Sequence, residues 1–348
     1  MNDILSQLQL HMKTHPALEL SDAIKFLYQG CMGNGHLMLD REAAWNYLVE
    51  EWQETPVCHT APLTESLGNG LCRLSLAGCK ELGLSVHTLF ALFLRANQLF
   101  SPSQATLKTL LPQLCSLFPH TDQIADIQRY LQAGMPMVSH SQTYRDTYTP
   151  AYRLVLEQDI SLLPLCAAID RHMAQNPRTI VALDGPCAAG KSTIGALLSQ
   201  LYGCPLVHMD DFFLPQTQKT PARLSQAGGN IDAERFLTQV LLPVSCGKPA
   251  KYQPYHCHTD DFGEWLEIPP SALTIIEGVY ALRPDLQPYY SICCYIDAPW
   301  TIRRERLLKR CGEDGLARFE ALWIPLEQQY FETFQIESLC PIKIKACF

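Results

Sequence analysis

One stretch of the sequence constrains the fold more than any other, the segment DGPCAAGKST at residues 184–193. The residues before it, 179–183 (TIVAL), form a short apolar run typical of a buried strand, and residues 194–198 (IGALL) supply the apolar side of a helix. A strand, a turn of small residues and a helix in this order are typical of an α/β fold with a parallel sheet. We therefore expect the turn to lie at the carboxyl edge of such a sheet.

Four positions of this turn fit the pattern GxxxxGK[ST], the P-loop: Gly185, Gly190, Lys191 and Ser192. Glycines let backbone N–H groups turn inward around phosphate oxygens, and the helix that follows adds the positive end of its dipole. Lys191 can reach the outer phosphates, and Ser192 can hold Mg²⁺. The motif therefore predicts a nucleoside triphosphate site, and the alternative is a glycine-rich turn with a surface lysine. The predicted nucleotide-binding residues are Gly185, Pro186, Cys187, Ala188, Ala189, Gly190, Lys191, Ser192 and Thr193.

Acidic residues end two further predicted strands. Asp210 and Asp211 follow the strand at 205–209, and Glu277 follows the apolar residues of TIIEG. Ligands bind at the carboxyl edge of open α/β sheets, so a carboxylate there can accept a proton from an attacking hydroxyl and help to orient Mg²⁺. We predict Ser192, Asp210 and Glu277 as metal ligands. The alternative is that the acids belong to turns and cap helices.

A basic helix is predicted at 299–311, which contains TIRRERLLKR. Arg303 and Arg306 are three residues apart and share a helix face, whereas Arg304 points elsewhere. Guanidinium groups on one face match phosphate oxygens bidentately. Pairing of these arginines with Glu305 or Glu313 is the alternative.

The chain has two halves with different patterns. Beyond residue 177, apolar strands are predicted near 179–183, 205–209, 273–277, 291–296 and 342–346, with helices after the glycine turn and near 232–242, 299–311 and 314–334. Such alternation predicts a parallel sheet with helices on both faces. Residues 1–175 are mainly helical, with helix starts near Ser21, Asp40, Ser85, Ser103 and Thr121, and with one predicted strand at 71–76. We place the domain boundary between residues 175 and 176, because Pro177 ends the preceding helix.

The role of the first half stays open. The turn GNGH brings His36 to the start of a helix and could hold an anion, or could be only a tight connection. In residues 138–155, Tyr144, Tyr148 and Tyr152 recur every four residues near His140, and Pro150 interrupts any single helix. This segment is either an amphipathic interface or part of a phosphate or sugar pocket.

Composition excludes some classes of partner. The formal net charge of −8 argues against a nucleic-acid partner, although the helix at 299–311 forms a local basic patch. The sequence has no apolar run near the roughly 20 residues that span a bilayer, so we expect no membrane partner and a cytoplasmic protein; a homo-oligomer stays open. The 15 cysteines include no CxxC pair, and we expect most to be buried apolar residues. Residues 256–258 (HCH) could supply metal ligands.

Several segments together resemble the family of uridine kinase and phosphoribulokinase, which are small-molecule kinases. These are DGPCAAGKST, HMDDFF, NIDAERF, YQPYHCHTDDFGEW and IIEGVYAL, in this order, and the resemblance covers about residues 178–348. It implies a P-loop kinase fold for 176–348 and phosphoryl transfer from ATP, with Mg²⁺, to a hydroxyl of a small molecule such as a nucleoside or related sugar.

The resemblance also implies residue roles. Asp210 matches the catalytic base, and Lys191 with the lid arginines Arg303 and Arg306 completes the predicted catalytic set. The predicted substrate contacts are Asp210, Asp232, Tyr255, His258 and Glu277. The sequence departs from the uridine kinases after Tyr255 and after the basic helix, so the acceptor stays open. Two alternatives to a kinase also remain, an ATPase that drives a shape change and a nucleotide-binding regulatory protein without a small-molecule acceptor.

Overall fold

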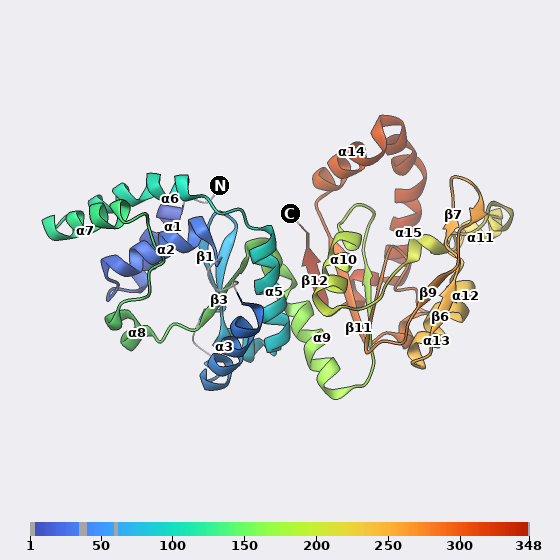
Figure 1. Ribbon diagram of the computed structural model, residues 1–348. Coiled ribbons are helices and arrows are strands. Elements are labelled where there is room, and N and C mark those ends of the chain that lie inside the picture. Colours follow the sequence, from blue (N-terminus) through green and yellow to red (C-terminus); the bar gives the residue numbers. More distant parts are fainter. Residues whose placement is uncertain (1–3, 35–39, 59–61, 347–348) are drawn as a thin grey trace. The chain divides into compact units, whose positions relative to one another are not determined.

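The computed structural model describes residues 4–34, 40–58 and 62–346 and divides into two compact units, Met1–Ile160 and Ser161–Phe348 (Figure 1). The first unit combines helices with a three-stranded antiparallel sheet in the order β1-β2-β3. Its strands are β1 (Thr64–Gly68), β2 (Leu71–Ser75) and β3 (Tyr152–Leu156). Its helices are α1 (Ile4–Thr14), α2 (Leu20–Met32), α3 (Arg41–Glu54), α4 (Leu76–Leu82), α5 (Val86–Leu99), α6 (Gln104–Leu110), α7 (Thr121–Gln132) and α8 (Gln142–Tyr148), with 3-10 turns η2 (Leu111–Ser116) and η3 (Glu157–Leu162).

The predicted helix starts of this unit are confirmed within one residue. Asp40 caps α3 by accepting from two backbone N–H groups, and the hydroxyls of Ser85 and Ser103 cap α5 and α6. Thr121 is the first residue of α7, and α2 begins one residue before Ser21. Side-chain caps of this kind satisfy N–H groups that have no partner inside the helix.

The prediction of a single strand in this unit was incomplete. Residues 71–76 do form β2 and the start of α4, but β1 and β3 pair with β2 on either side. Tyr144 and Tyr148 lie on α8, whereas Tyr152 begins β3, so the four-residue tyrosine spacing does not continue as one helix. The burial of β3 does not alternate, because four successive residues are buried, and this hides the usual strand pattern. His36 lies outside the described residues.

The second unit is built on a five-stranded parallel sheet in the order β12-β11-β4-β10-β5. All five predicted strands are present: β4 (Thr179–Asp184), β5 (Leu206–His208), β10 (Leu273–Glu277), β11 (Ile292–Asp297) and β12 (Ile342–Lys345). Two small antiparallel pairs were not predicted, β6 (Ala250–Tyr252) with β9 (Leu266–Ile268) and β7 (Tyr255–His256) with β8 (Asp261–Phe262). These short pairs have no apolar run of their own.

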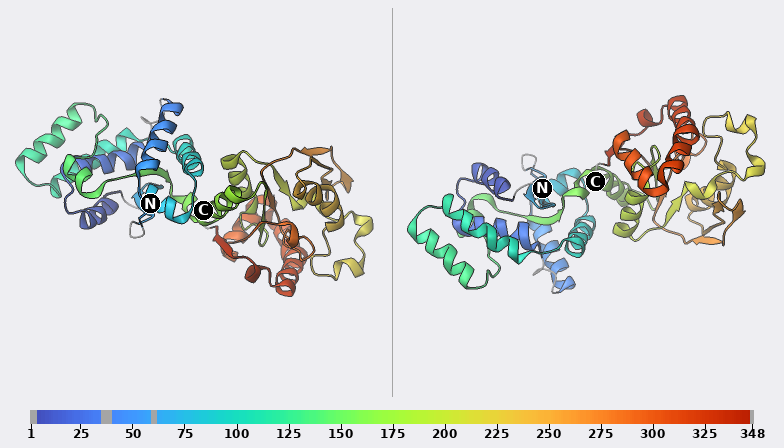
Figure 2. Two further views of the ribbon diagram at one scale, coloured as in Figure 1. Left: turned by 90° about the horizontal axis from the view of Figure 1, so that it is seen from below. Right: turned by 90° about the horizontal axis from the view of Figure 1, so that it is seen from above.

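The helices of this unit begin with α9 (Leu163–Gln175) and α10 (Lys191–Tyr202). Shorter helical pieces follow, namely η4 (Met209–Phe212), η5 (Gln216–Gln218), α11 (Pro221–Leu224), α12 (Ala233–Phe236), the π-helical η6 (Leu237–Leu241), α13 (Leu242–Ser245) and η7 (Gln287–Tyr289). Then α14 (Trp300–Arg318), the π-helical η8 (Phe319–Trp323) and α15 (Ile324–Phe334) form a bent helical arm before α16 (Ile336–Leu339). The helical arm, residues 300–334, is coloured orange to red in Figures 1 and 2.

The division into units differs from the expected boundary. It falls between Ile160 and Ser161, so α9 is grouped with the second unit and not with the first. The reason is packing, because α9 contacts β4 and β11 and buries Leu163, Cys166 and Ile169. Pro177 does end this helix, but the helix covers the sheet that follows it in the sequence.

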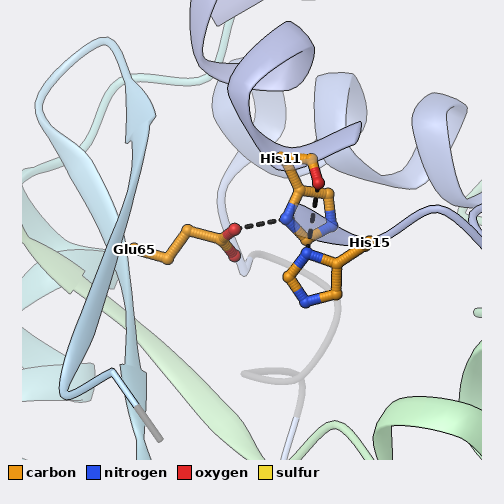
Figure 3. A group of neighbouring side chains, drawn as sticks. All are labelled: His11, His15 and Glu65. Carbon is orange, nitrogen blue, oxygen red and sulfur yellow. Dashed lines mark hydrogen bonds and ion pairs between the residues drawn. The ribbon is translucent and has the colours of Figure 1, made fainter. Parts of the chain in front are cut away.

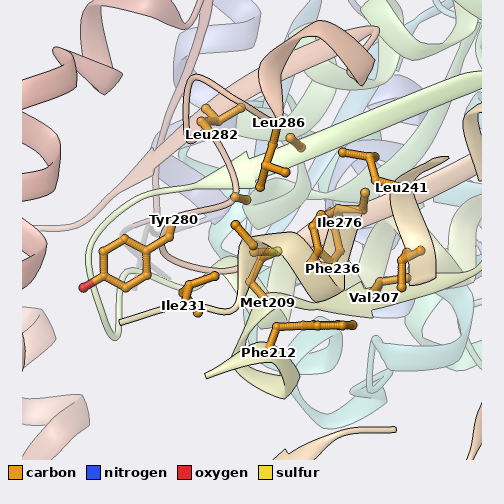
Figure 4. Close-up of a cluster of buried hydrophobic side chains, with 14 of the residues drawn as sticks. Val207, Met209, Phe212, Ile231, Phe236, Leu241, Ile276, Tyr280, Leu282 and Leu286 are labelled. Carbon is orange, nitrogen blue, oxygen red and sulfur yellow. The ribbon is translucent and has the colours of Figure 1, made fainter. Parts of the chain in front are cut away.

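The core of the second unit holds the carboxyl edge of the sheet in place. All six residues of β4 are buried, because β10 and β11 flank it and helices cover it. Figure 4 shows the apolar cluster in which Val207 and Ile276 of the sheet pack with Met209, Phe212 and Phe236. Register places Glu277 beside both Leu183 and His208. The loops after β4, β10 and β5 therefore start from one edge of the sheet.

Two expectations from composition can be compared with the structure. Of the 14 cysteines in the described part of the chain, all are free and eight are buried. Every helix among the described residues is too short or too polar to cross a lipid bilayer.

Candidate active site

The glycine loop between β4 and α10 needs its glycines for two different reasons. Gly185 has φ of 145°, and a Cβ at this position would lie 1.9 Å from the backbone oxygen of Ile296. Gly190 has φ of 109° and serves as the N-cap of α10. L-residues rarely adopt such φ values, and the first position has no space for a side chain. The loop can therefore turn tightly from the strand into the helix.

The loop lines a cavity of about 490 Å³, a size common for small-ligand sites. Its lining residues from the loop and the first turn of α10 are Cys187, Ala188, Gly190, Lys191, Ser192 and Thr193. Lys191 is buried, and its ammonium group donates to the carbonyl oxygens of Gly185 at 2.8 Å and Pro186 at 2.9 Å. The backbone carbonyl groups of the loop thus hold the positive charge of Lys191 close to the loop.

Asp210 and Glu277 line the same cavity as Lys191. Asp210 faces the cavity, but the surrounding protein reduces its hydration, and this desolvation raises the pKa of its carboxyl. The positive charge of Lys191 acts in the opposite direction, and the negative charge of Glu277 in the same direction. The sheet therefore brings together a lysine from the segment after β4, a carboxylate from the segment after β5 and the carboxylate at the end of β10.

His208 was not predicted as part of this site. Its Nδ1 lies 2.5 Å from Oε1 of Glu277, and this hydrogen bond raises the pKa of the imidazole. The side chain of Glu277 is only 4% exposed, so the histidine is its close polar neighbour in a largely dry position. The sequence signal was available, since His208 lies at the end of the predicted strand 205–209, one residue before its last residue and two residues before Asp210.

Asp184, which precedes the loop, was also missed. It is fully buried and accepts hydrogen bonds from the N–H of Gly185 at 2.6 Å, the N–H of Leu282 at 2.9 Å and the hydroxyl of Tyr330 at 2.7 Å. Burial raises its pKa to about 6, although these hydrogen bonds lower it. An acid that ends a wholly apolar strand directly before Gly185 could have been singled out as a polar group that needs buried partners.

The helical arm contacts the glycine loop through charged side chains. Nε of Arg303 donates to the carbonyl of Cys187 at 2.9 Å, and Nη1 of Arg306 donates to the carbonyl of Ala188 at 3.0 Å. Arg304 lies on another face, 3.7 Å from a carboxylate oxygen of Glu320. The shared face predicted for Arg303 and Arg306 is confirmed, and it faces the loop. Of these two, Arg306 lines the cavity, together with Arg310.

The second helix of the arm supplies an acid that was not predicted. Glu327 on α15 is 6% exposed, lines the cavity and accepts a 2.8 Å hydrogen bond from the N–H of Cys187. Burial raises the pKa of its carboxyl. Residues 314–334 were predicted as helix, but nothing in the local pattern showed that Glu327 and Tyr330 meet the loop.

Three predicted substrate contacts are not among the described residues that line the cavity. Asp232 caps α12, where it accepts from the backbone N–H of Arg235 at 3.1 Å and pairs with its guanidinium at 3.3 Å. Tyr255 donates its hydroxyl to Asp260, and His258 is exposed. The cavity lining instead includes Phe213, Asn230, Cys257, Val279, Tyr280, Phe319 and Trp323.

No protein-family model and no curated protein matches this sequence. A comparison with solved structures matches a possible uridine kinase from Bacillus stearothermophilus, with 20% identity and a TM-score of 0.38 over 52% of this chain and 98% of that chain. A candidate fructose transport system kinase from Silicibacter sp. TM1040 has 22% identity and a TM-score of 0.42 over 52% and 95%. TT1252 from Thermus thermophilus has 19% identity and a TM-score of 0.24 over 44% and 84%.

Proposed function

We propose that the second unit is a kinase that transfers the γ-phosphoryl group of ATP to a hydroxyl of a small molecule. Nucleosides and related sugars are the first acceptors to test. The observation that carries the proposal is that Lys191 and Asp210 line one cavity at the carboxyl edge of a parallel sheet, with Glu277 between their strands. A cationic phosphate site and a carboxylate that can accept a proton are the two parts that this reaction needs.

The phosphate side of the cavity comes from the glycine loop. The N-terminal end of α10 presents backbone N–H groups and the positive end of a helix dipole, and Lys191 adds a full charge. Arg306 and Arg310 approach from the helical arm. Positive groups that converge on a transferring phosphoryl group stabilise its charge, which is the main contribution of a protein to this reaction.

The acceptor side of the cavity comes from Asp210 and an aromatic wall. The raised pKa of Asp210 favours acceptance of the proton from the acceptor hydroxyl as its oxygen attacks the γ-phosphorus. Phe213 and Trp323, whose rings lie 6.1 Å apart, line the same cavity and offer apolar faces to a ring-containing acceptor. A cavity of about 490 Å³ fits a small-molecule acceptor that carries a hydroxyl better than it fits a polymer.

The residues present also fit Mg²⁺. Ser192, Asp210 and Glu277 all line the cavity and offer hydroxyl and carboxylate oxygens, the donors that Mg²⁺ prefers. These three residues would hold the ion, which supplies charge neutralisation to the phosphates.

A screen of nucleosides, sugars and vitamin-like alcohols with labelled ATP tests the proposal directly. A kinase should form ADP slowly until its acceptor is added, and the label should then appear in the acceptor. Formation of ADP at the same rate without any acceptor would instead support the ATPase. Nucleotide binding without turnover under any condition would support the regulatory protein.

The variant Asp210→Asn tests the role of the base. We expect turnover to fall by about 10² or more because the proton acceptor is lost, with the affinity for ATP largely kept. Asp211→Asn is the matched control, since Asp211 accepts a 3.0 Å hydrogen bond from Tyr252 and does not line the cavity. Equal turnover in the Asp210→Asn variant and the wild type would contradict the assignment. Isothermal titration with ATP separates binding from chemistry.

A further inference from the structure

The first unit contains a cluster of side chains that the proposed kinase does not use. His11 lies on the last turn of helix α1, His15 directly follows the last residue of that helix, and β1 carries Glu65 beside them (Figure 3). One ring nitrogen of each histidine and one carboxylate oxygen of Glu65 all lie within 4.8 Å of one another. Within the described ranges, no other group of three histidine, cysteine or acidic side chains converges in this way. The segment HCH at residues 256–258, which the sequence suggested as metal ligands, does not form such a group.

His11 has a polar neighbour at each of its two ring nitrogens. Nδ1 of His11 contacts Oε1 of Glu65, and Nε2 of the same ring lies 3.1 Å from the hydroxyl of Tyr144. When a metal ion replaces the proton between Nδ1 and Oε1, Nδ1 offers its lone pair to the ion, and Nε2 carries the ring proton and can donate it to Tyr144. Nη1 of Arg73 lies 3.5 Å from the same Nε2. A partner on the far nitrogen is the usual way in which proteins orient a histidine ligand.

His15 and Glu65 are also held by their neighbours. Nδ1 of His15 lies 3.1 Å from the carbonyl oxygen of His11 and 2.9 Å from the hydroxyl of Thr14, and these contacts orient the ring. Arg73 donates to Oε2 of Glu65 at 2.9 Å, which orients the carboxylate and leaves Oε1 for the metal. The charge of Arg73 opposes a nearby cation, but the guanidinium is shared with Gln29, to which it donates at 2.8 Å and 3.1 Å.

We propose that His11, His15 and Glu65 bind one zinc ion. Two imidazole nitrogens and one carboxylate oxygen form a ligand set that zinc favours, and the imidazoles make it a poor site for Mg²⁺ or Ca²⁺. Three protein ligands leave one tetrahedral position for water or a substrate group, which is the arrangement of catalytic and not of structural zinc sites. Binding displaces the proton shared by His11 and Glu65 to solvent. The site lies in the first unit and does not depend on the proposed kinase.

The competing interpretation is a buried polar network without a metal. His11 is 3% exposed and would then serve only as the partner of Glu65, beside the ion pair of Glu65 with Arg73. This interpretation predicts that zinc has no specific affinity for the cluster.

The experiment measures zinc binding to the full chain by equilibrium dialysis, after a chelator has been used and removed. We expect one zinc ion per chain. His15→Ala and Glu65→Gln should each weaken binding by about tenfold or more. These variants are chosen because both residues are only partly buried, whereas replacing buried His11 could unfold the unit. His120→Ala, at an exposed histidine of the same unit, and the double variant His256→Ala/His258→Ala should bind zinc as the wild type does.

Circular dichroism without zinc identifies the variants that remain folded, and X-ray data at the zinc absorption edge locate the ion. Anomalous density between the rings of His11 and His15 and the carboxylate of Glu65 supports the proposal. The absence of specific binding to the folded wild-type chain overturns it. Zinc binding that persists unchanged in either folded variant overturns it as well, because the replaced side chain is then not a ligand.

Discussion

Replacement of Asp184 by asparagine tests the electrostatics beneath the glycine loop. Burial raises the pKa of this carboxyl to about 6 from the model-peptide value of 3.8. Since one pH unit corresponds to about 1.4 kcal/mol, the shift corresponds to about 3 kcal/mol. Between these two values the folded state keeps a proton that the unfolded state has released. The stability of the second unit therefore falls as pH rises through this window and is constant with respect to Asp184 above it.

Asparagine removes the ionisation and keeps the shape. The Asp184→Asn variant should therefore gain about 3 kcal/mol relative to the wild type between pH 4 and pH 7. A second effect opposes this gain, because the amide NH₂ can face the N–H of Leu282, which donates to Asp184 at 2.9 Å. An unsatisfied buried donor costs about 1 to 3 kcal/mol, but this cost is the same at every pH. The pH dependence, and not the stability at one pH, is the quantity to compare.

The assay is a urea series at several pH values between 4 and 7, in which hydrogen peroxide oxidises methionines that unfolding exposes. Met209 is fully buried in the second unit, so its oxidation, read by mass spectrometry, reports the unfolding of that unit. Tyr330→Phe is the matched variant, because it keeps the ring and removes one hydrogen bond that lowers the pKa of Asp184. In this variant the pH range over which the stability of the second unit falls should move to higher pH. Parallel stability curves for Asp184→Asn and the wild type would refute the reasoning.

Two further predictions concern the same edge of the sheet. Gly185→Ala should destabilise the second unit by on the order of 3 kcal/mol or more, because its Cβ would lie 1.9 Å from the backbone oxygen of Ile296. In the control Gly203→Ala the new Cβ has open space, and the positive φ alone should cost only about 1 kcal/mol. Equal losses of stability in urea titrations of the two variants would be evidence against the steric argument. The bond to Glu277 raises the pKa of His208, so the charged pair stabilises the fold fully below about pH 6.5, and this contribution is lost as pH rises through the raised pKa. His208→Gln should therefore lower the melting temperature at pH 6 and have less effect at pH 9, and a larger effect at pH 9 would contradict the assignment.

The elements that the sequence predicted correctly have local causes. Strands β4, β10 and β11 are apolar runs, and the caps at Asp40, Ser85 and Ser103 depend on a side chain and the backbone two or three residues later. The strand β3 was missed because its pairing with β2 joins residues far apart, as in the register of Leu71 with Leu156, and no local pattern contains that information. The strand β1 pairs with β2 in a local hairpin, as in the register of Gly68 with Leu71, and was missed although its partner was predicted.

The candidate site also contains some features that were predictable from the sequence and others that were not. The positions of Gly185, Lys191, Asp210 and Glu277 at strand ends were predictable, because parallel strands bring their carboxyl ends to one edge. Their catalytic and metal-binding roles stay predictions. Asp232 and Tyr255 were assigned through resemblance alone, and local hydrogen bonds instead engage both side chains.

By itself the sequence determined the glycine loop, the parallel sheet and the helix face that carries Arg303 and Arg306, because short-range spacing and apolar periodicity encode each of them. Only the tertiary structure decided that Tyr330 holds Asp184, that Glu327 meets the N–H of Cys187, and that His11 and His15 meet Glu65. These contacts join segments between about 50 and 146 residues apart. Such pairs form only when a whole unit packs, since the desolvation of each buried polar group must be offset by a partner that the fold brings from elsewhere.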